Sequence, residues 1–269
     1  MSSPFSAGNA GVPLPSSFFT RDGERFVATA LTRGPWSDDA QHGGPPAALL
    51  ARAIEREAGE AFLARLTVEL LRPIPIATFD VRTTVLRPGR KVRLFQASLL
   101  HEGVELARAT GLALAEAPVA LPARAPRTAG LPSPQASAPF EFPFFRNAIG
   151  YQSAMEIRVA RGRFGEGAMA AWMRMRFPLV AGETPSPLQR VAVAADAGNG
   201  ISVALDVERY TFINPDLTIH LHRRLAGEWL CLDATTDPEP NGVGLAQTQL
   251  SDESGPIGRS LQSLLVSAR

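Results

Sequence analysis

The chain has 269 residues, of which 45% are hydrophobic and 20% charged, so it can build one large domain or two small ones with a full apolar core. Its 27 basic and 26 acidic side chains leave a net charge of +1. The chain therefore lacks the large net positive charge that would attract nucleic acid or an acidic membrane. The sequence contains no run of about 18 apolar residues, so it predicts no membrane-spanning helix. Its single cysteine excludes a disulfide within the chain.

The N-terminal stretch MSSPFSAGNAGVPLPSS has neither the basic flank nor the apolar centre of a signal peptide, so we expect a cytoplasmic protein. Strand-like residues follow at 23–32. The sequence HGGPP, residues 42–46, then opens an amphipathic helix, because two prolines suit its first turn and Gly59 ends it. Its apolar stripe consists of Ala47, Leu50, Ala51 and Ile54.

Four long segments of alternating pattern come next and predict strands at residues 64–73, 79–88, 91–100 and 104–115. Short turns between successive strands imply antiparallel pairing, with the helix lying on the sheet. Residues 117–143 hold seven of the chain's 23 prolines, which predicts a linker or an extended strap.

The two sides of this seam resemble each other. When residues 66–103 are shifted by 151 positions without gaps, ten of the 38 pairs are identical, among them Leu66/Leu217 and Thr67/Thr218. Ordinary composition would give roughly two or three matches. The sequence therefore predicts an internal duplication.

The second half repeats the order of elements. Strand-like segments at 155–164 and 168–177 precede a helix that Ser186 can cap and Pro187 can begin. Leu188, Val191, Ala192 and Ala195 form its apolar stripe, and the glycines of GNG, residues 198–200, are expected to end it. Strands follow after Asp216, and Cys231 in the run EWLCLD is expected to be a buried thiol.

Asp196 lies one turn past Ala192, near the edge of the apolar stripe of the second helix. A carboxylate that faces the core is costly unless it has a partner, which makes it a candidate for a functional site. It could instead be a solvated turn residue before AGNG. The first helix has no carboxylate on its apolar face, so the two halves would have to share one site.

The segments HGGPPAALLARAIE, AVAADAGNG, YTFINPDLTIHLHR, EWLCLDATT and LAQTQLSD, in this order and spacing, resemble the acyl-CoA thioesterase II family over about residues 17–268. The resemblance implies an α+β fold, a double hotdog of two tandem repeats, each with a long helix wrapped by an antiparallel β-sheet. The repeats would span residues 1–116 and 144–269, joined by the linker 117–143. It also implies hydrolysis of acyl-CoA to free acid and coenzyme A in fatty acid metabolism, without a metal or other cofactor.

In this family a catalytic Asp on the helix is paired with a hydroxyl residue on the next strand and with a later Gln. The resemblance assigns the Asp to Asp196 and places Asn214 where the hydroxyl residue is expected. An Asn at this position departs from the pattern of the family. If the alignment of this strand were shifted, Thr211 or Thr218 would take the position of the hydroxyl residue instead. Asp196 would take a proton from a water that the other two residues align.

The Gln position of the family falls on Gln249. Gln247 lies on the same strand face and is the second candidate. Either side chain could also be an ordinary exposed strand residue.

His42, Gly43 and Gly44 are expected to contact the substrate, because the two glycine N–H groups at the positive end of the first helix suit a developing oxyanion. The glycines could instead serve only a tight turn. Coenzyme A carries several phosphates. They could bind at the basic turn RPGRKVR, through Arg87, Arg90, Lys91 and their neighbour Arg93, unless this turn is only a solvated hairpin tip.

Two other functions fit the same residues. His42 and Asp196 could form the acid–base pair of a hotdog hydratase or dehydratase, or the fold could bind acyl-CoA without catalysis. His220 and His222 have strand-face spacing for a metal, but no third ligand stands out. Association of two double hotdogs into a homodimer is open.

Overall fold

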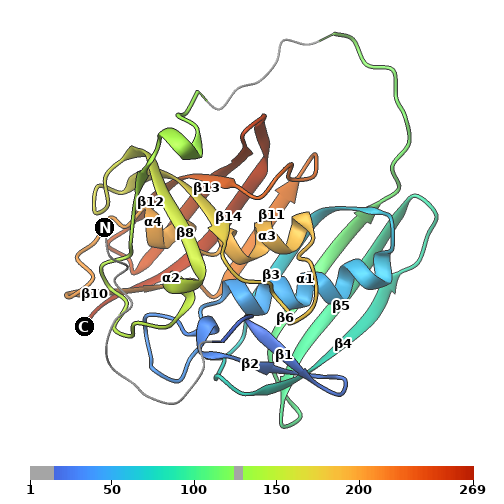
Figure 1. Ribbon diagram of the computed structural model, residues 1–269, viewed down its shortest axis with the longest axis horizontal. Helices are drawn as coiled ribbons and strands as arrows, with labels where there is room; N and C mark the ends of the chain where they lie inside the picture. The colour runs from blue at the N-terminus through green and yellow to red at the C-terminus, as the bar shows by residue number, and fades with distance from the viewer. Residues whose placement is uncertain (1–14, 124–129) are drawn as a thin grey trace.

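The computed structural model describes residues 15–123 and 130–269, and it has an α+β fold built around one 14-stranded sheet (Figure 1). All described pairings between strands are antiparallel. The predicted α+β class with an antiparallel sheet is therefore confirmed. In the described part of the chain, no helix has both the length and the apolar character needed to cross a bilayer.

The first half of the chain contributes these elements: β1 (Phe19–Asp22), β2 (Arg25–Ala28), the 3-10 turn η1 (Ala30–Thr32), α1 (Gly44–Ala58), β3 (Phe62–Leu70), β4 (Thr78–Arg87), β5 (Val92–His101) and β6 (Val104–Leu114). The second half contributes η2 (Pro134–Ala136), β7 (Ala138–Pro139), α2 (Tyr151–Ala154), β8 (Met155–Gly162), β9 (Ala168–Met175), α3 (Pro187–Ala195), α4 (Gly198–Ile201), β10 (Tyr210–Ile213), β11 (Asp216–Leu221), β12 (Leu230–Pro238), β13 (Val243–Asp252) and β14 (Gly255–Ala268).

Helix α1 forms as the sequence predicts. Pro45 and Pro46 occupy its first turn, where a missing N–H costs nothing, and Gly59 follows its last residue with φ = 61°. Helix α3 begins at Pro187, and the Ser186 hydroxyl accepts a hydrogen bond from the N–H of Gln189.

The end of the second helix differs from the prediction. The GNG segment does not simply end the helix, because α3 stops at Ala195 and residues 198–201 form the separate turn α4. Helix α3 therefore has 9 residues against 15 in α1.

The strand order relates the two halves. The sheet runs β1-β2-β4-β5-β6-β3 and continues as β11-β14-β13-β12-β9-β8-β7. Read outward from the centre, each half has the same order of strands. At the centre, Thr67 pairs with Thr218, Leu66 with Ile219 and Val68 with Leu217, so the shift of 151 residues relates β3 to β11 about the Thr67/Thr218 pair.

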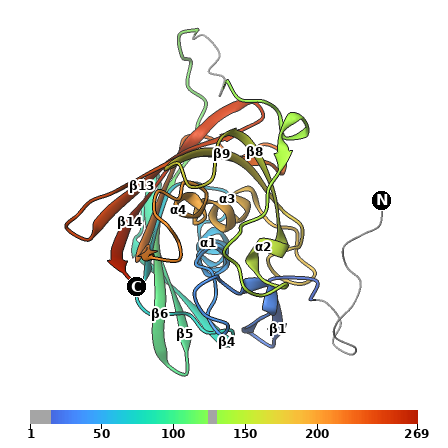
Figure 2. The same cartoon turned by 90° about the vertical axis from the view of Figure 1, so that its left-hand side faces the viewer.

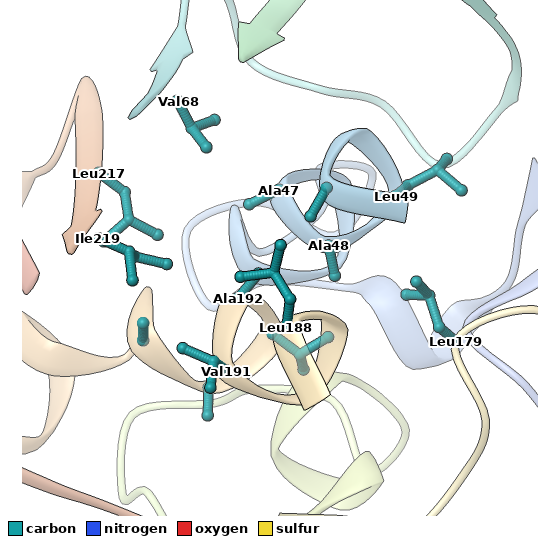
Figure 3. Packing of buried hydrophobic residues seen from close by; sticks show 14 of the residues in the cluster. Ala47, Ala48, Leu49, Val68, Leu179, Leu188, Val191, Ala192, Leu217 and Ile219 are labelled. Carbon is teal, nitrogen blue, oxygen red and sulfur yellow. The ribbon is translucent and has the colours of Figure 1, made fainter. Parts of the chain in front are cut away.

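The helices lie inside the curved sheet, as Figure 2 shows for α1, α3 and α4. Ala48 of α1 lies beside Leu188 and Ala192 of α3 in Figure 3, and all three residues are buried. Alanines at this contact let the two helices approach closely. A Cβ atom on Gly44 would lie only 2.3 Å from the carbonyl oxygen of Val193.

The proline-rich seam contains short structure after residue 130. Strand β7 pairs with β8, and Trp172 Nε1 donates a hydrogen bond to the carbonyl of Pro132. Residues 117–123 are exposed and irregular, and they leave the sheet as an extended segment (Figure 1). From residue 130 onward the seam thus lies along the second half as a strap.

Candidate active site

Asp196 is the C-cap of α3 and is only 4% exposed, so it is not a solvated turn residue. Helices α1 and α3 are antiparallel, and the end of α3 therefore meets the start of α1. This arrangement brings the Asp196 carboxylate to Gly43 and Gly44. A Cβ atom on Gly43 would lie 2.8 Å from Asp196 Oδ2.

Both oxygens of the Asp196 carboxylate accept hydrogen bonds. Asn214 Nδ2 donates to Oδ1 over 2.8 Å, and His42 Nδ1 lies 3.0 Å from Oδ2. The Gly44 N–H also hydrogen-bonds the carboxylate. It lies 3.1 Å from His42 Nδ1 as well, but an Nδ1 that donates its hydrogen to Asp196 has no lone pair for a second donor.

These contacts keep the carboxylate ionised although it is buried. Burial alone would raise the pKa of Asp196, but the attraction of His42 in its protonated form and the hydrogen bonds from His42, Asn214 and the Gly44 N–H together hold that pKa below its ordinary value. The same negative charge, added to full burial, raises the pKa of the Tyr151 hydroxyl well above its ordinary value.

His42 is held in a fixed orientation. Its ring stacks on Tyr151 with centroids 3.7 Å apart and planes within 2°, and its side chain is 14% exposed. The Tyr151 hydroxyl in turn donates to the carbonyl of Val193 over 2.9 Å. His42 Nε2, on the ring edge away from Asp196, makes no hydrogen bond with any residue of the described chain.

Gly43 and Gly44 do not adopt the positive φ that a tight turn would require of glycine. They are glycines because of the close approach of α3. The Gly44 N–H is engaged with Asp196, and the next two helix residues are prolines without an N–H. The Gly43 N–H has no hydrogen-bond partner among the described residues, so it remains as the donor available at this end of α1.

A different Gln occupies the position predicted for Gln249. Gln262 on β14 is 1% exposed, and its Nε2 donates to the backbone carbonyl of Asp196 over 3.0 Å. Its Oε1 accepts from the Asn199 N–H over 3.1 Å. Gln249 lies on the opposite face of β13 from Thr248, which points toward α4, so the structure does not bring Gln249 to Asp196.

Gln247, Thr218 and Thr211 also lie away from the Asp196 carboxylate. Gln247 is exposed on the same outer face of β13 as Gln249. The Thr218 hydroxyl donates to Thr67 across the centre of the sheet, and Thr211 pairs with Ser267. Asn214 is therefore the residue of this strand region that reaches Asp196.

A cavity of about 380 Å³ opens beside this group. Asp196, His42, Gly43 and Asn214 line one side of it. The rest of the lining is mostly apolar and aromatic, and it includes Trp36, Leu70, Ile74, Phe142, Phe144 and Phe212. Phe142 lies at the end of the proline-rich seam and Phe144 directly after it, so residues from both halves of the chain and from the seam build the cavity.

The basic turn lies away from this cavity. Arg87, Arg90 and Lys91 are exposed, and the neighbouring Arg93 donates through Nη2 to the carbonyl of Ala58, the last residue of α1. Helix α1 is about 22 Å long at 1.5 Å per residue, so this hairpin and Gly43 lie at opposite ends of it. The structure does not bring these cations to Asp196.

The remaining candidate residues do not form a second group of this kind. His220 and His222 are exposed, and within residues 15–123 and 130–269 no three His, Cys, Asp or Glu side chains are grouped to hold a metal. Cys231 is buried beside Trp172 and Trp229. Burial raises the pKa of its thiol to about 12, so it is no nucleophile at neutral pH.

Known families match nearly the whole described chain. The profile of the acyl-CoA thioesterase N-terminal domain matches residues 32–114, and that of the acyl-CoA thioesterase C-terminal domain matches residues 122–266. No curated protein sequence matches the chain.

Solved structures with the same fold include a protein described as a thioesterase II from Thermobifida fusca (TM-score 0.74, 19% identity, 94% of this chain and 96% of that chain). Another is described as a thioesterase from Novosphingobium aromaticivorans (TM-score 0.72, 20% identity, 94% and 99%). A third is described as an acyl-CoA thioesterase II from Mycobacterium marinum (TM-score 0.63, 15% identity, 91% and 94%).

Proposed function

Because this chain belongs to the acyl-CoA thioesterase family and is thus a thioester hydrolase, we propose that it hydrolyses acyl-CoA with the Asp196–His42 pair as its water-activating group. The observation that carries this proposal is the buried, ionised Asp196 carboxylate 3.0 Å from a histidine that lines the 380 Å³ cavity. We place the reaction in the cytoplasm and in fatty acid metabolism.

We further propose that the chain is a double hotdog, with repeats at residues 1–116 and 144–269 and the linker 117–143. The matching strand orders of the two halves and the central Thr67/Thr218 pair support this division. The helix of the second repeat is interrupted after Ala195, and this interruption places the Asp196 carboxylate at the start of α1. A single site shared by both repeats follows from the arrangement.

Asp196 assists the attack of water through His42. Both carboxylate oxygens already accept hydrogen bonds from protein groups, whereas His42 Nε2 has no partner among the described residues. With Nδ1–H donated to Asp196, Nε2 is the acceptor and takes a proton from water, and the carboxylate stabilises the imidazolium that forms. Asn214 and Gln262 are positioning residues that hold Asp196 in place.

The thioester carbonyl is best placed with its oxygen toward the Gly43 N–H, at the positive end of α1. Water oxygen bonds to the carbonyl carbon, and negative charge develops on the carbonyl oxygen. The carbon–sulfur bond then breaks, and the thiolate of coenzyme A takes the proton held by His42. The products are a free carboxylic acid and a free thiol, so atoms and charges balance without another reactant.

The direct test is release of free thiol from a panel of short, medium, long and aromatic acyl-CoAs, followed with a chromogenic disulfide. Cys231→Ser serves as the background control. We expect turnover on at least one substrate, and a His42→Gln loss in kcat on the order of 10² to 10⁴. If the wild-type protein releases no thiol from any acyl-CoA of the panel, the proposal is contradicted.

The same pair supports one other reaction. A histidine beside a carboxylate, each from a different half, also suits hydration of an enoyl-CoA, and the 3.0 Å His42–Asp196 contact fits that chemistry. Loss of the conjugated thioester absorbance without thiol release would identify a hydratase. Hydrolysis of the enoyl-CoA also removes this absorbance but releases an equal amount of thiol, so thiol release supports the hydrolase.

A further inference from the structure

We propose that the opposite ends of α1 and α3 form a second, non-catalytic site for an acyl-CoA. A cavity of about 390 Å³ lies there, lined by Glu55, Phe62, Leu63, Leu188, Arg224 and Leu225. The class of ligand rests on the proposed function, but the site itself rests on the geometry of this end of the molecule.

The second cavity is related to the first by the internal repeat. Residues from 61–63 and 221–225 line the second cavity, and residues 212–214 and 70–74 line the first. The shift of 151 positions that aligns the halves carries 61–63 onto 212–214 and 70–74 onto 221–225. Two equivalent hollows of nearly equal volume are therefore present at the two ends of the helix pair.

The second cavity lacks the polar groups of the first. The shift of 151 positions replaces Asn214 by Leu63 and Gln262 by Gly111. The two helices start at Gly44 and Pro187, 143 positions apart, and this spacing puts Ala53 where α3 has Asp196. What remains is a hollow whose apolar wall, Phe62, Leu63, Leu188 and Leu225, suits an acyl chain and which has no group in these positions to activate water.

Two carboxylates line the second cavity, Glu55 and the exposed Glu60, and Glu55 already has partners within the protein. Its two oxygens accept from the Ser186 hydroxyl over 2.8 and 2.7 Å, and one accepts from Gln189 Nε2 over 3.1 Å. Burial raises the pKa of Glu55 despite these hydrogen bonds. Glu55 therefore holds Ser186, the N-cap of α3, and its oxygens are engaged within the protein rather than turned to a ligand.

The basic turn lies beside this cavity. Phe62, in the cavity wall, pairs with Leu114, and Leu114 pairs with Val92, so two strand spacings of about 4.8 Å separate Phe62 from Val92 next to Lys91. Arg93 donates to Ala58 at the end of α1. A separation of about 10 Å is short enough for one molecule to join an apolar tail to a phosphate-bearing head.

The charges around the entrance favour an anionic head group. Arg87, Arg90 and Lys91 are exposed cations of the turn, and Arg224 lies over the Phe62 ring at the cavity. Their acidic neighbours at this end are Glu55, Glu57, Glu60 and Glu116, of which Glu116 pairs with Arg224 over 2.6 Å. The turn itself carries no carboxylate, and its cations are suited to binding the phosphates of coenzyme A.

Calorimetric titration of the full chain with the non-hydrolysable thioether S-octyl-coenzyme A tests the second site. We expect two binding events in the wild-type protein. Leu225→Trp fills the second cavity, so it should remove one event and keep thiol release. The matched variant Ile74→Trp, at the equivalent position of the first cavity, should remove the other event and stop thiol release.

A surface variant tests the site without altering either cavity. Arg90→Glu with Lys91→Glu should weaken one of the two binding events at least tenfold. One equivalent bound by an active wild-type protein would overturn the second site and leave the proposed function intact. Two equivalents bound without thiol release from any acyl-CoA would instead refute the proposed function and leave the second site intact.

Discussion

Replacing Gly44 by alanine tests how closely helices α1 and α3 approach each other. The new Cβ atom would lie 2.3 Å from the Val193 carbonyl oxygen, whereas ordinary contact begins at 3.4 Å. The helices would have to separate by about 1 Å, and overpacking of this kind costs about 1–3 kcal/mol. Alanine recovers about 0.5–1 kcal/mol of helix propensity, so we expect a net loss on the order of 0.5–2 kcal/mol.

The matched variant Gly43→Ala separates stability from function. Its Cβ would lie 2.8 Å from Asp196 Oδ2 and 3.0 Å from a Leu70 methyl group, both of which are side-chain atoms that can move. We expect Gly43→Ala to displace the carboxylate from His42 and to lower kcat by about 10²-fold, as a misplacement near 1 Å can do.

Thermal unfolding followed by circular dichroism, together with thiol release, measures both effects. For a chain of this size, Gly44→Ala should lower Tm by about 1–8 °C, because each kcal/mol corresponds to about 2–4 °C. An unchanged Tm in Gly44→Ala would refute the close approach at Val193. Full activity in Gly43→Ala would refute the placement of the carboxylate against the start of α1.

Gln262, Cys231 and Asp196 each support a further prediction. Gln262→Leu leaves the Asn199 N–H and the Asp196 carbonyl without their partner, so urea unfolding should show a loss of about 1–3 kcal/mol, whereas Gln249→Leu on the outer face should stay within about 0.5 kcal/mol. Equal losses would contradict the assignment of Gln262. Cys231, with a thiol pKa of about 12, should react with a chromogenic disulfide only after unfolding, and rapid reaction in the native protein would contradict its burial. The folded pKa of Asp196 lies below that of a free Asp, so its ionisation stabilises the fold above about pH 4 and that stability is lost as the pH falls through the folded pKa. The stability difference between wild type and Asp196→Asn should therefore shrink on acidification from pH 7 to pH 3, and a constant difference would contradict the lowered pKa.

The spacing of apolar residues, together with prolines and glycines at the ends of elements, is sufficient to predict most of the helices and strands. Alternating apolar residues predicted β3 to β6, and Pro45, Pro46 and Gly59 bounded α1. These signals depend only on residues that are near one another in the sequence, so they can be interpreted without knowledge of the fold. The end of α3 was missed because the glycines of GNG are typical of a helix stop, whereas the structure places them in the next helical turn, α4.

The candidate site was only partly predictable, because several of its contacts join distant segments. Gln262 was missed since Leu261 and Leu265 beside it are exposed, which reverses the apolar alternation that would have marked its face as buried. Tyr151 gave no signal, since nothing in the sequence indicates that its ring stacks on His42. The basic turn could not be assigned to one end of α1 from sequence, because that position depends on the pairing of β5 with β6.

The contact between Asp196 and His42 is the centre of the proposed mechanism, and Asp196→Asn tests it most directly. An amide donor facing Nδ1 favours the wrong tautomer of His42, so its Nε2 no longer accepts the proton of water. With an acyl-CoA that the wild type hydrolyses, thiol release should fall in kcat by about 10² to 10⁴ while the circular dichroism spectrum stays unchanged. Full activity of a folded Asp196→Asn protein would contradict the proposed water-activating pair.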